Sequence, residues 1–214
     1  RVLFRSTVWF FIALAGIFAW AGRGLERIER RWVWSILTVA VAARVVAVAF
    51  LFLTTSHDQI ASFFWDGDGV ALKIRALLIR NVWLGVPIDS ADFSYAFDPG
   101  YGWTSYLNLL AYLQYLLGPA PYAIHLFNIA AFTASAVLLH RLARSAYGSA
   151  SALLGLAIIV FLPTLFAWSV SALKESVYVL LSAIALSATV AVIRADGVVR
   201  RLIAVLLPAG SAVI

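Results

Sequence analysis

Long apolar runs separated by short polar stretches make up most of the 214-residue sequence. A helix needs roughly 20 apolar residues to cross a bilayer. Five runs approach or reach that length, and a further apolar run begins at Leu202. The pattern therefore predicts transmembrane helices over residues 7–22, 32–53, 122–143, 149–168 and 176–193.

Two residues interrupt these runs. Arg44 lies near the middle of the second run. An arginine at the membrane centre costs roughly 2.5–3.5 kcal/mol on insertion scales. We therefore expect Arg44 to face protein and to have a buried partner, because snorkelling to an interface would be strained from there. Pro163, near the outer end of the fourth run, predicts a kink of the kind that membrane helices tolerate.

Composition places the chain among membrane proteins. Hydrophobic residues make up 64% of the chain and charged residues 12%, about half of the roughly 25% charged residues in an average protein. The sequence has no cysteine, which excludes disulfide frameworks and thiolate metal sites. The basic residues behind the net charge of +6 flank apolar runs. We interpret them as signals of membrane orientation and expect no nucleic-acid partner.

The predicted fold class is all-α: a polytopic transmembrane helical bundle with a large extracytoplasmic first loop that carries interfacial helices. We expect an integral, multi-pass membrane protein, in the cytoplasmic membrane if the source is bacterial. Residues 1–214 form one transmembrane module without an internal repeat. Because the chain starts at Arg1 rather than Met and stops inside an apolar run, we expect it to be the N-terminal part of a longer protein.

The predicted first loop, residues 54–121, differs in composition from the rest. Six of the ten acidic residues lie in it. Two of them, Asp66 and Asp68, stand one residue apart beside glycines. This loop is therefore the best candidate for chemistry at a bilayer surface.

Residues 69–83 of this loop have the pattern of a helix. Apolar side chains recur at helical spacing, and Lys73 and Arg80 lie seven residues apart on another face. A short apolar helix with a basic stripe is typical of the membrane interface.

Residues 103–117 form an apolar stretch that could either cross the membrane or lie at its surface. If it crossed, the arginines after it would lie outside the cytoplasm, against the positive-inside rule. If it does not cross, they join Arg23 to Arg31 in the cytoplasm. We predict that it does not cross. The arginines concerned are Arg141, Arg144, Arg194, Arg200 and Arg201.

The order of these elements resembles the N-terminal module of the GT-C superfamily of membrane glycosyltransferases, which includes protein O-mannosyltransferases and bacterial transferases that use polyprenyl-phosphate sugars. The likeness covers residues 32–193. It consists of a span with an arginine, an outer loop with an acidic pair and an interfacial helix, the stretch Asp98-Pro99-Gly100-Tyr101, a short apolar helix that ends in glycine, and a further span. Each motif is short, and the likeness rests on order as much as on identity.

The resemblance implies an inverting transferase that moves a sugar from a polyprenyl-phosphate donor to an acceptor hydroxyl on the extracytoplasmic face. It implies that the acidic pair, Asp66 and Asp68, is catalytic, without deciding which aspartate is the base. It also implies substrate contacts for Tyr101, for Glu175, and for His125, which stands where the family usually has an arginine.

The chemistry of such a reaction explains these residue types. A positioned carboxylate can deprotonate the acceptor while an oxocarbenium-like centre forms. The departing lipid phosphate needs cations, and Lys73, Arg80 and Lys174 lie on the expected side. Paired aspartates can also hold a divalent ion, so a metal role stays open and no cofactor is assigned. The expected partners are a polyprenyl-phosphate sugar donor, membrane lipid, and an acceptor (lipid, glycan or protein) that the sequence leaves open.

Other interpretations use the same residues differently. The chain could be a transporter or flippase for a lipid-linked or anionic substrate, with Arg44 and Glu175 in its pathway, or a structural subunit of an envelope assembly. Transporters place broken helices and ionisable residues near the midplane. Here most acidic residues lie in one outer loop, which favours chemistry at the surface, although an Asp-x-Asp beside glycines is also typical of a solvated turn.

Overall fold

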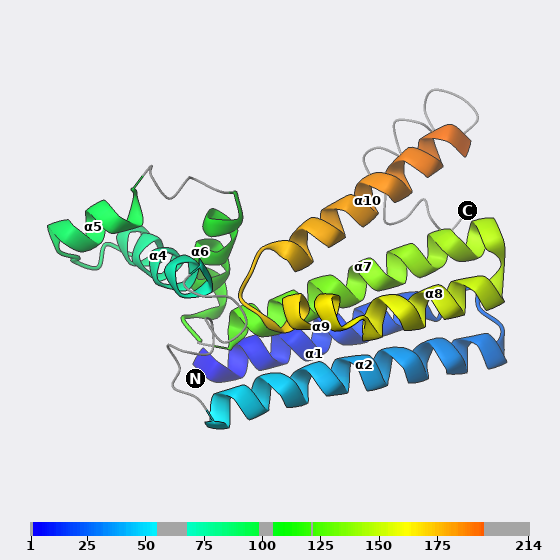
Figure 1. Cartoon of the computed structure of the whole chain (residues 1–214). Coiled ribbons are helices and arrows are strands. Elements are labelled where there is room, and N and C mark those ends of the chain that lie inside the picture. Colours follow the sequence, from blue (N-terminus) through cyan, green and yellow to red (C-terminus); the bar gives the residue numbers. More distant parts are fainter. Residues whose placement is uncertain (1, 55–67, 99–104, 121, 195–214) are drawn as a thin grey trace.

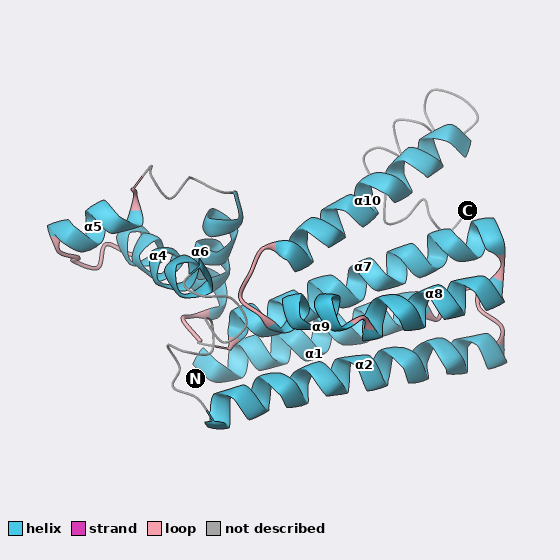
Figure 2. Cartoon of the chain, viewed as in Figure 1, coloured by secondary structure: helices cyan, strands magenta, loops and turns pink. Residues whose placement is uncertain are grey.

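The computed structural model describes residues 2–54, 68–98, 105–120 and 122–194. These residues form helices joined by turns, and no strand occurs among them (Figure 2). The all-α prediction is therefore confirmed. In chain order the helices are α1 (Val2–Ala21), α2 (Arg27–Thr54), α4 (Asp68–Trp83), α5 (Ser90–Ala96), α6 (Ser105–Leu117), α7 (Ala123–Tyr147), α8 (Ser149–Phe161), α9 (Pro163–Val170) and α10 (Glu175–Arg194).

The body of the molecule is a bundle in which α1, α2, α7 and α8 run alongside one another (Figure 1). The central helix is α7. In the most apolar 18-residue stretch of each helix, the buried share is 78% in α7, 33% in α2 and 22% in α10. One apolar cluster joins α7 to α1, α2 and α8, and a second joins it to α1, α2 and α9. The bundle is thus built around α7.

A smaller helical unit, made of α4, α5 and α6, lies at one end of this bundle (Figure 1). Its main internal contact is between α4 and α6. A third apolar cluster fills that contact and continues into the first turn of α7 and the start of α10. The members of this cluster include Ala76, Ile79, Leu107, Leu110, Ile124 and Val177.

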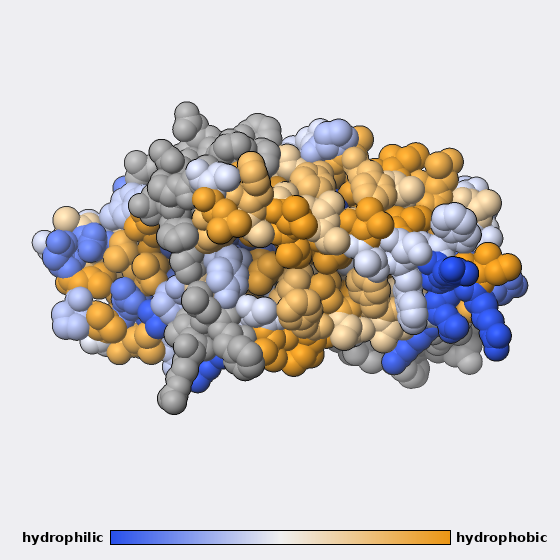
Figure 3. Space-filling view, turned by 90° about the horizontal axis from the view of Figure 1, so that it is seen from below, coloured by the Kyte–Doolittle hydropathy of each residue, from blue (hydrophilic) through white to orange (hydrophobic). Residues whose placement is uncertain are grey.

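Three of the described helices, α2, α7 and α10, are long and apolar enough to cross a membrane. A fourth span results if α8 and α9 are counted as one bent helix, and α1 contributes the shorter apolar stretch Arg5–Ala21. Figure 3 shows hydrophobic side chains over the middle of the bundle and a strongly hydrophilic group at the end where α2 begins. By length and composition, these helices are compatible with a membrane protein.

The predicted span over residues 149–168 is broken. Its two halves, α8 and α9, meet at an angle of 57°, so the bend is much larger than the tolerated kink expected from the sequence. Proline disfavours helical geometry in the residue before it, and Leu162 accordingly adopts φ −61° and ψ 121°. Pro163 then begins α9, a position where its missing N–H costs nothing.

Arg44 lies inside the bundle at this break and is almost fully buried, with 1% of its surface exposed. Its Nη2 donates to the carbonyl oxygen of Val160, the second-last residue of α8, at 2.8 Å. Its Nε donates to Ser169 Oγ on α9 at 2.6 Å. The rings of Phe132 and Phe166 lie 4.7 and 4.9 Å from the guanidinium carbon. The prediction that Arg44 faces protein and has buried partners is confirmed.

Candidate functional site

The candidate site lies where the small helical unit meets the bundle. The segment between α9 and α10, residues 171–174, passes through this region and is not helical. We call it the α9–α10 turn. Helix ends leave carbonyl oxygens without helical partners, so the turn needs donors from other elements, and α6 and α7 supply them.

Two side chains hold the turn by its main chain. Asn128 on α7 donates from Nδ2 to the carbonyl oxygens of Ser171 and Leu173, each at 2.8 Å. Tyr106 on α6 donates from its hydroxyl to the carbonyl oxygens of Ala172 and Leu173, each at 3.0 Å. Because Asn128 is fully buried and Tyr106 nearly so, these bonds are shielded from water and fix the position of the turn.

Burial raises the pKa of the Tyr106 phenol well above its usual value; the hydrogen bond to Asn128 lowers it, and the charge of Glu175 raises it. Tyr106 therefore keeps its proton throughout the physiological pH range. It acts as a permanent donor to the turn rather than as a base.

His125 holds the residue just before the turn. Its Nδ1 lies 2.7 Å from the carbonyl oxygen of Val170. Since a carbonyl oxygen only accepts, Nδ1 carries the proton. The rings of Phe52 and His125 pack in a T-shaped arrangement, with 5.9 Å between their centroids. These contacts explain why His125 is buried, and its role in substrate binding stays a prediction.

Glu175 begins α10 directly after the turn. A carboxylate in this position is favoured by the helix dipole. One of its oxygens, Oε2, is buried without a hydrogen-bond partner among the described residues, and so is the hydroxyl of the next residue, Ser176. Lys174 Nζ lies 5.8 Å from the ring centroid of Tyr178. The site thus presents a buried acceptor with unused capacity beside a lysine.

The two predicted phosphate ligands of α4 differ in their contacts. Arg80 donates to the carbonyl oxygen of Gln114 near the end of α6 at 3.1 Å and to Asn81 Oδ1 at 3.0 Å. Lys73 is half-buried and lies within electrostatic range of His125. Lys73 is therefore within electrostatic range of a residue that binds just before the α9–α10 turn, whereas Arg80 is engaged with α6.

Sequence analysis did not single out Arg75, which is buried in α4 with 2% of its surface exposed. Its Nη2 donates to the carbonyl oxygens of Ala96 and Asp98 at 3.3 and 3.1 Å, and so attaches α5 to α4. A signal was present: Arg75 lies three and four residues before Leu78 and Ile79, which places it on the apolar face of the helix.

The acidic pair is only partly described. Asp68 is the first residue of α4, and α4 packs on α6 in the small unit at one end of the bundle (Figure 1). Asp66 and Tyr101, also predicted as site residues, lie outside the described residues. Among the residues that the structure describes, no three His, Asp or Glu side chains are grouped so that they could hold a metal ion.

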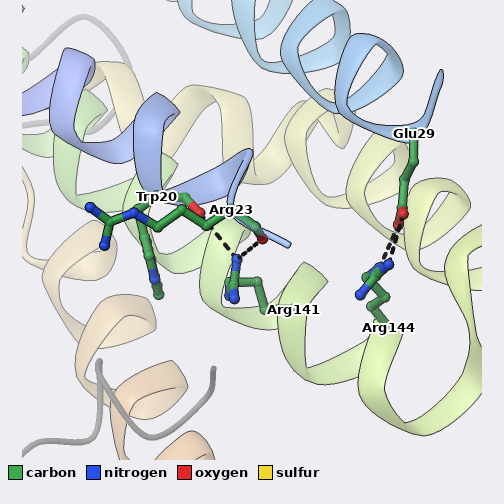
Figure 4. A network of polar contacts seen from close by, with 5 residues as sticks. All are labelled: Trp20, Arg23, Glu29, Arg141 and Arg144. Atoms are coloured by element: carbon green, nitrogen blue, oxygen red, sulfur yellow. Dashed lines mark hydrogen bonds and ion pairs between the residues drawn. The ribbon is translucent and has the colours of Figure 1, made fainter. Parts of the chain in front are cut away.

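The opposite end of the bundle carries most of the described arginines. Arg144 forms a bidentate ion pair with Glu29 at 2.7 and 3.0 Å, and Arg141 donates to the carbonyl oxygens of Trp20 and Arg23 at 3.1 and 3.0 Å (Figure 4). These contacts join the end of α7 to the α1–α2 turn. The arginines therefore gather at one end of the bundle, and α6 lies at the other (Figure 1).

No protein-family model, curated protein or solved structure matches this chain.

Proposed function

We propose that the chain is a polytopic integral membrane protein with its arginine-rich end in the cytoplasm. Three long apolar helices and the bent pair α8–α9 support this proposal. So does the gathering of arginines at one end, because basic loops are retained in the cytoplasm. The small unit of α4, α5 and α6 then lies on the extracytoplasmic side.

Cysteine labelling tests this topology, because the sequence has no cysteine of its own. Ser94→Cys on α5 and Pro119→Cys between α6 and α7 replace exposed residues. In intact cells we expect both to react with a membrane-impermeant maleimide. Ala146→Cys, exposed at the end of α7, should react only after permeabilisation. If Pro119→Cys reacts only after permeabilisation while Ser94→Cys reacts in intact cells, α6 crosses the membrane and the topology is wrong.

We further propose that the protein containing this sequence is a membrane glycosyltransferase of the GT-C type. It would transfer a sugar from a polyprenyl-phosphate donor to an acceptor hydroxyl at the extracytoplasmic end. One observation carries the proposal: among the described residues, a buried carboxylate oxygen of Glu175 has no hydrogen-bond partner. Glu175 directly follows Lys174 at the start of α10, and α4, which begins with Asp68, shares an apolar cluster with this part of α10. A carboxylate with spare acceptor capacity suits a hydroxyl-bearing substrate, since hydroxyl groups donate hydrogen bonds.

In this proposal each charged group has a separate task. One aspartate of the Asp66–Asp68 pair takes the proton of the acceptor hydroxyl as the bond to the sugar forms. Lys73 and Lys174 neutralise the negative charge that develops on the departing lipid phosphate. Glu175 accepts a hydrogen bond from a sugar or acceptor hydroxyl and thereby orients it.

A second function, a carrier for a lipid-linked or anionic substrate, is favoured by a different observation. The helix pair α8–α9 is broken, and a buried arginine lies against the break. Broken helices and ionisable residues near the midplane are features of secondary transporters. Since Arg44 has hydrogen-bond partners on both α8 and α9, we favour a structural role for it and rank the carrier second.

Reconstitution in liposomes separates the two functions. With a polyprenyl-phosphate donor labelled in its sugar and a membrane extract as the source of acceptor, we expect labelled sugar to move to the acceptor. Free polyprenyl phosphate should form in equal amount. Movement of intact labelled donor between leaflets, without any release of polyprenyl phosphate, would replace the transferase with the carrier.

A further inference from the structure

The first turns of α2 carry a groove of about 530 Å³ on the outer side of the helix. We call it the α2 groove. Three arginines line its polar end, and a tryptophan and two hydroxyl side chains continue it along the helix. All six residues are exposed. They are Arg27, Arg30, Arg31, Trp34, Ser35 and Thr38.

The positive charge of this groove is not neutralised from within the described structure. Two acidic residues stand among these arginines in the sequence. Glu29 is buried and gives both carboxylate oxygens to Arg144 on α7 (Figure 4). Glu26 is exposed just before Arg27 and, within the described structure, forms no ion pair with Arg27, Arg30 or Arg31. Among the described residues, the guanidinium groups of Arg27 and Arg31 make no side-chain hydrogen bond and no ion pair. The groove therefore keeps an excess of positive charge directed away from the bundle.

One wall of the groove is held in place by packing against the end of α1. The guanidinium of Arg30 stacks over the ring of Trp34, 5.7 Å from its centroid, and Trp34 Nε1 donates to the carbonyl oxygen of Phe18 at 3.1 Å. Gly22 makes this approach possible, because a Cβ there would lie 3.0 Å from Trp34 Nε1 and 3.1 Å from Arg30 Cδ. The wall is thus formed before any ligand binds.

The exposed surface of α2 changes from charged to apolar along its length. The arginines come first, Ser35 and Thr38 lie one to two turns further on, and large apolar side chains follow. Val39, Val46 and Phe50 are 58%, 66% and 61% exposed. The groups of a phospholipid follow the same order, from the charged phosphate through the polar ester oxygens to the apolar acyl chains. Tryptophan at the level of Trp34 is also typical of the membrane interface.

We propose that the α2 groove binds an anionic phospholipid of the cytoplasmic leaflet. The lipid phosphate accepts hydrogen bonds from Arg27 and Arg31, which lie one turn apart on the same face of the helix. The hydroxyl groups of Ser35 and Thr38 lie at the level of the ester groups, and the acyl chains lie along the apolar part of α2. This inference rests on the membrane insertion proposed above, and not on sugar transfer.

Lipid titration tests the groove directly. The purified protein in a nonionic detergent is titrated with short-chain phosphatidylglycerol, and bound lipid is measured by native mass spectrometry. We expect saturable binding that is stronger than that of phosphatidylcholine with the same chains. The double variant Arg27→Gln/Arg31→Gln should bind phosphatidylglycerol about thirtyfold more weakly, since each arginine near an anionic lipid contributes a factor of about five.

A charge-matched double variant is the control. Arg5→Gln/Arg23→Gln removes two exposed arginines outside the groove and should leave binding within about twofold of the parent protein. An equal loss in both double variants would overturn the proposal, because it would show that net charge alone attracts the lipid. Equal binding of phosphatidylglycerol and phosphatidylcholine would also overturn it.

Glycerol phosphate separates a lipid site from a simple anion site. If it competes as well as the whole lipid, the acyl chains contribute nothing and the proposal is wrong. The cysteine-labelling experiment tests the membrane insertion, on which the lipid site rests, independently of the lipid titration. Labelling of Ser94→Cys and Ala146→Cys from the same side would refute the proposed topology. A failed lipid titration together with the expected topology would refute only the lipid site in the α2 groove.

Discussion

Replacement of Arg44 by methionine should lower the stability of the bundle by about 3 kcal/mol, because it removes charge-assisted hydrogen bonds and leaves the buried carbonyl of Val160 without its donor. In a chain of this size we expect the midpoint of thermal unfolding in detergent to fall by about 6–12 °C. The guanidinium reaches α8 and α9 at once, so loss of compactness should begin at the break between them. Thermal loss of the monodisperse peak in size-exclusion chromatography measures this change.

Two further variants show whether the effect belongs to the buried contacts. Arg5→Met removes an exposed arginine of α1 and should shift the midpoint by less than about 2 °C, since surface charges contribute little to stability. Arg44→Lys should fall between the parent and the methionine variant, because a single ammonium lacks the fork that reaches two helices. An Arg44→Met protein as stable as Arg5→Met would contradict a fastening role for Arg44.

Loss of the catalytic base should have the largest effect on activity. If the transferase proposal holds, either Asp66→Asn or Asp68→Asn should lower sugar transfer on the order of 10²–10⁴-fold, because asparagine keeps the size of the side chain but cannot take a proton. The other variant should show a smaller loss, or a loss that depends on the concentration of divalent ions if that aspartate holds a metal. Transfer from labelled donor measures both effects.

Asp92→Asn is the matched control, because Asp92 is exposed on α5 and belongs to the same acidic segment of the chain. It should retain the activity of the parent protein. The two test variants should still insert, remain monodisperse and bind the lipid-linked donor, which separates chemistry from folding. Full transfer activity in both Asp66→Asn and Asp68→Asn would refute the assignment of the base.

Helix content and the burial of Arg44 followed from the sequence, whereas the partners of Arg44 did not. Apolar periodicity and the free-energy cost of a charge at membrane depth depend on residues close together in the sequence. Helices and the burial of Arg44 could therefore be predicted from short segments of the chain. The Val160 carbonyl lies 116 positions away, and it is available because Pro163 breaks the helix after it. A carbonyl has no signal in the sequence, so the sequence could predict a buried partner without identifying this one.

The candidate site shows the same limit. Lys73 was predicted from its charge and Glu175 from the family resemblance. In the structure Glu175 directly follows the α9–α10 turn, and Lys73 lies within electrostatic range of His125. The sequence could not show that Asn128 and Tyr106 hold this turn, because they bind main-chain oxygens that every residue has. Nor could it show that Arg80 donates a hydrogen bond to the end of α6. Helical spacing predicts the face on which a side chain lies, but not the element that packs against that face.

The way the α9–α10 turn is held has a consequence for how this protein can evolve. Asn128 and Tyr106 recognise carbonyl oxygens, which are the same whatever side chain the turn carries. Substitution at Ala172 by another small residue therefore leaves the anchoring bonds intact, whereas substitution at Asn128 removes two of them at once. Mutational tolerance should thus be divided unequally: the side chains of the turn and of its neighbours Lys174 and Glu175 can change without loss of these anchoring bonds, whereas Asn128 and Tyr106 cannot.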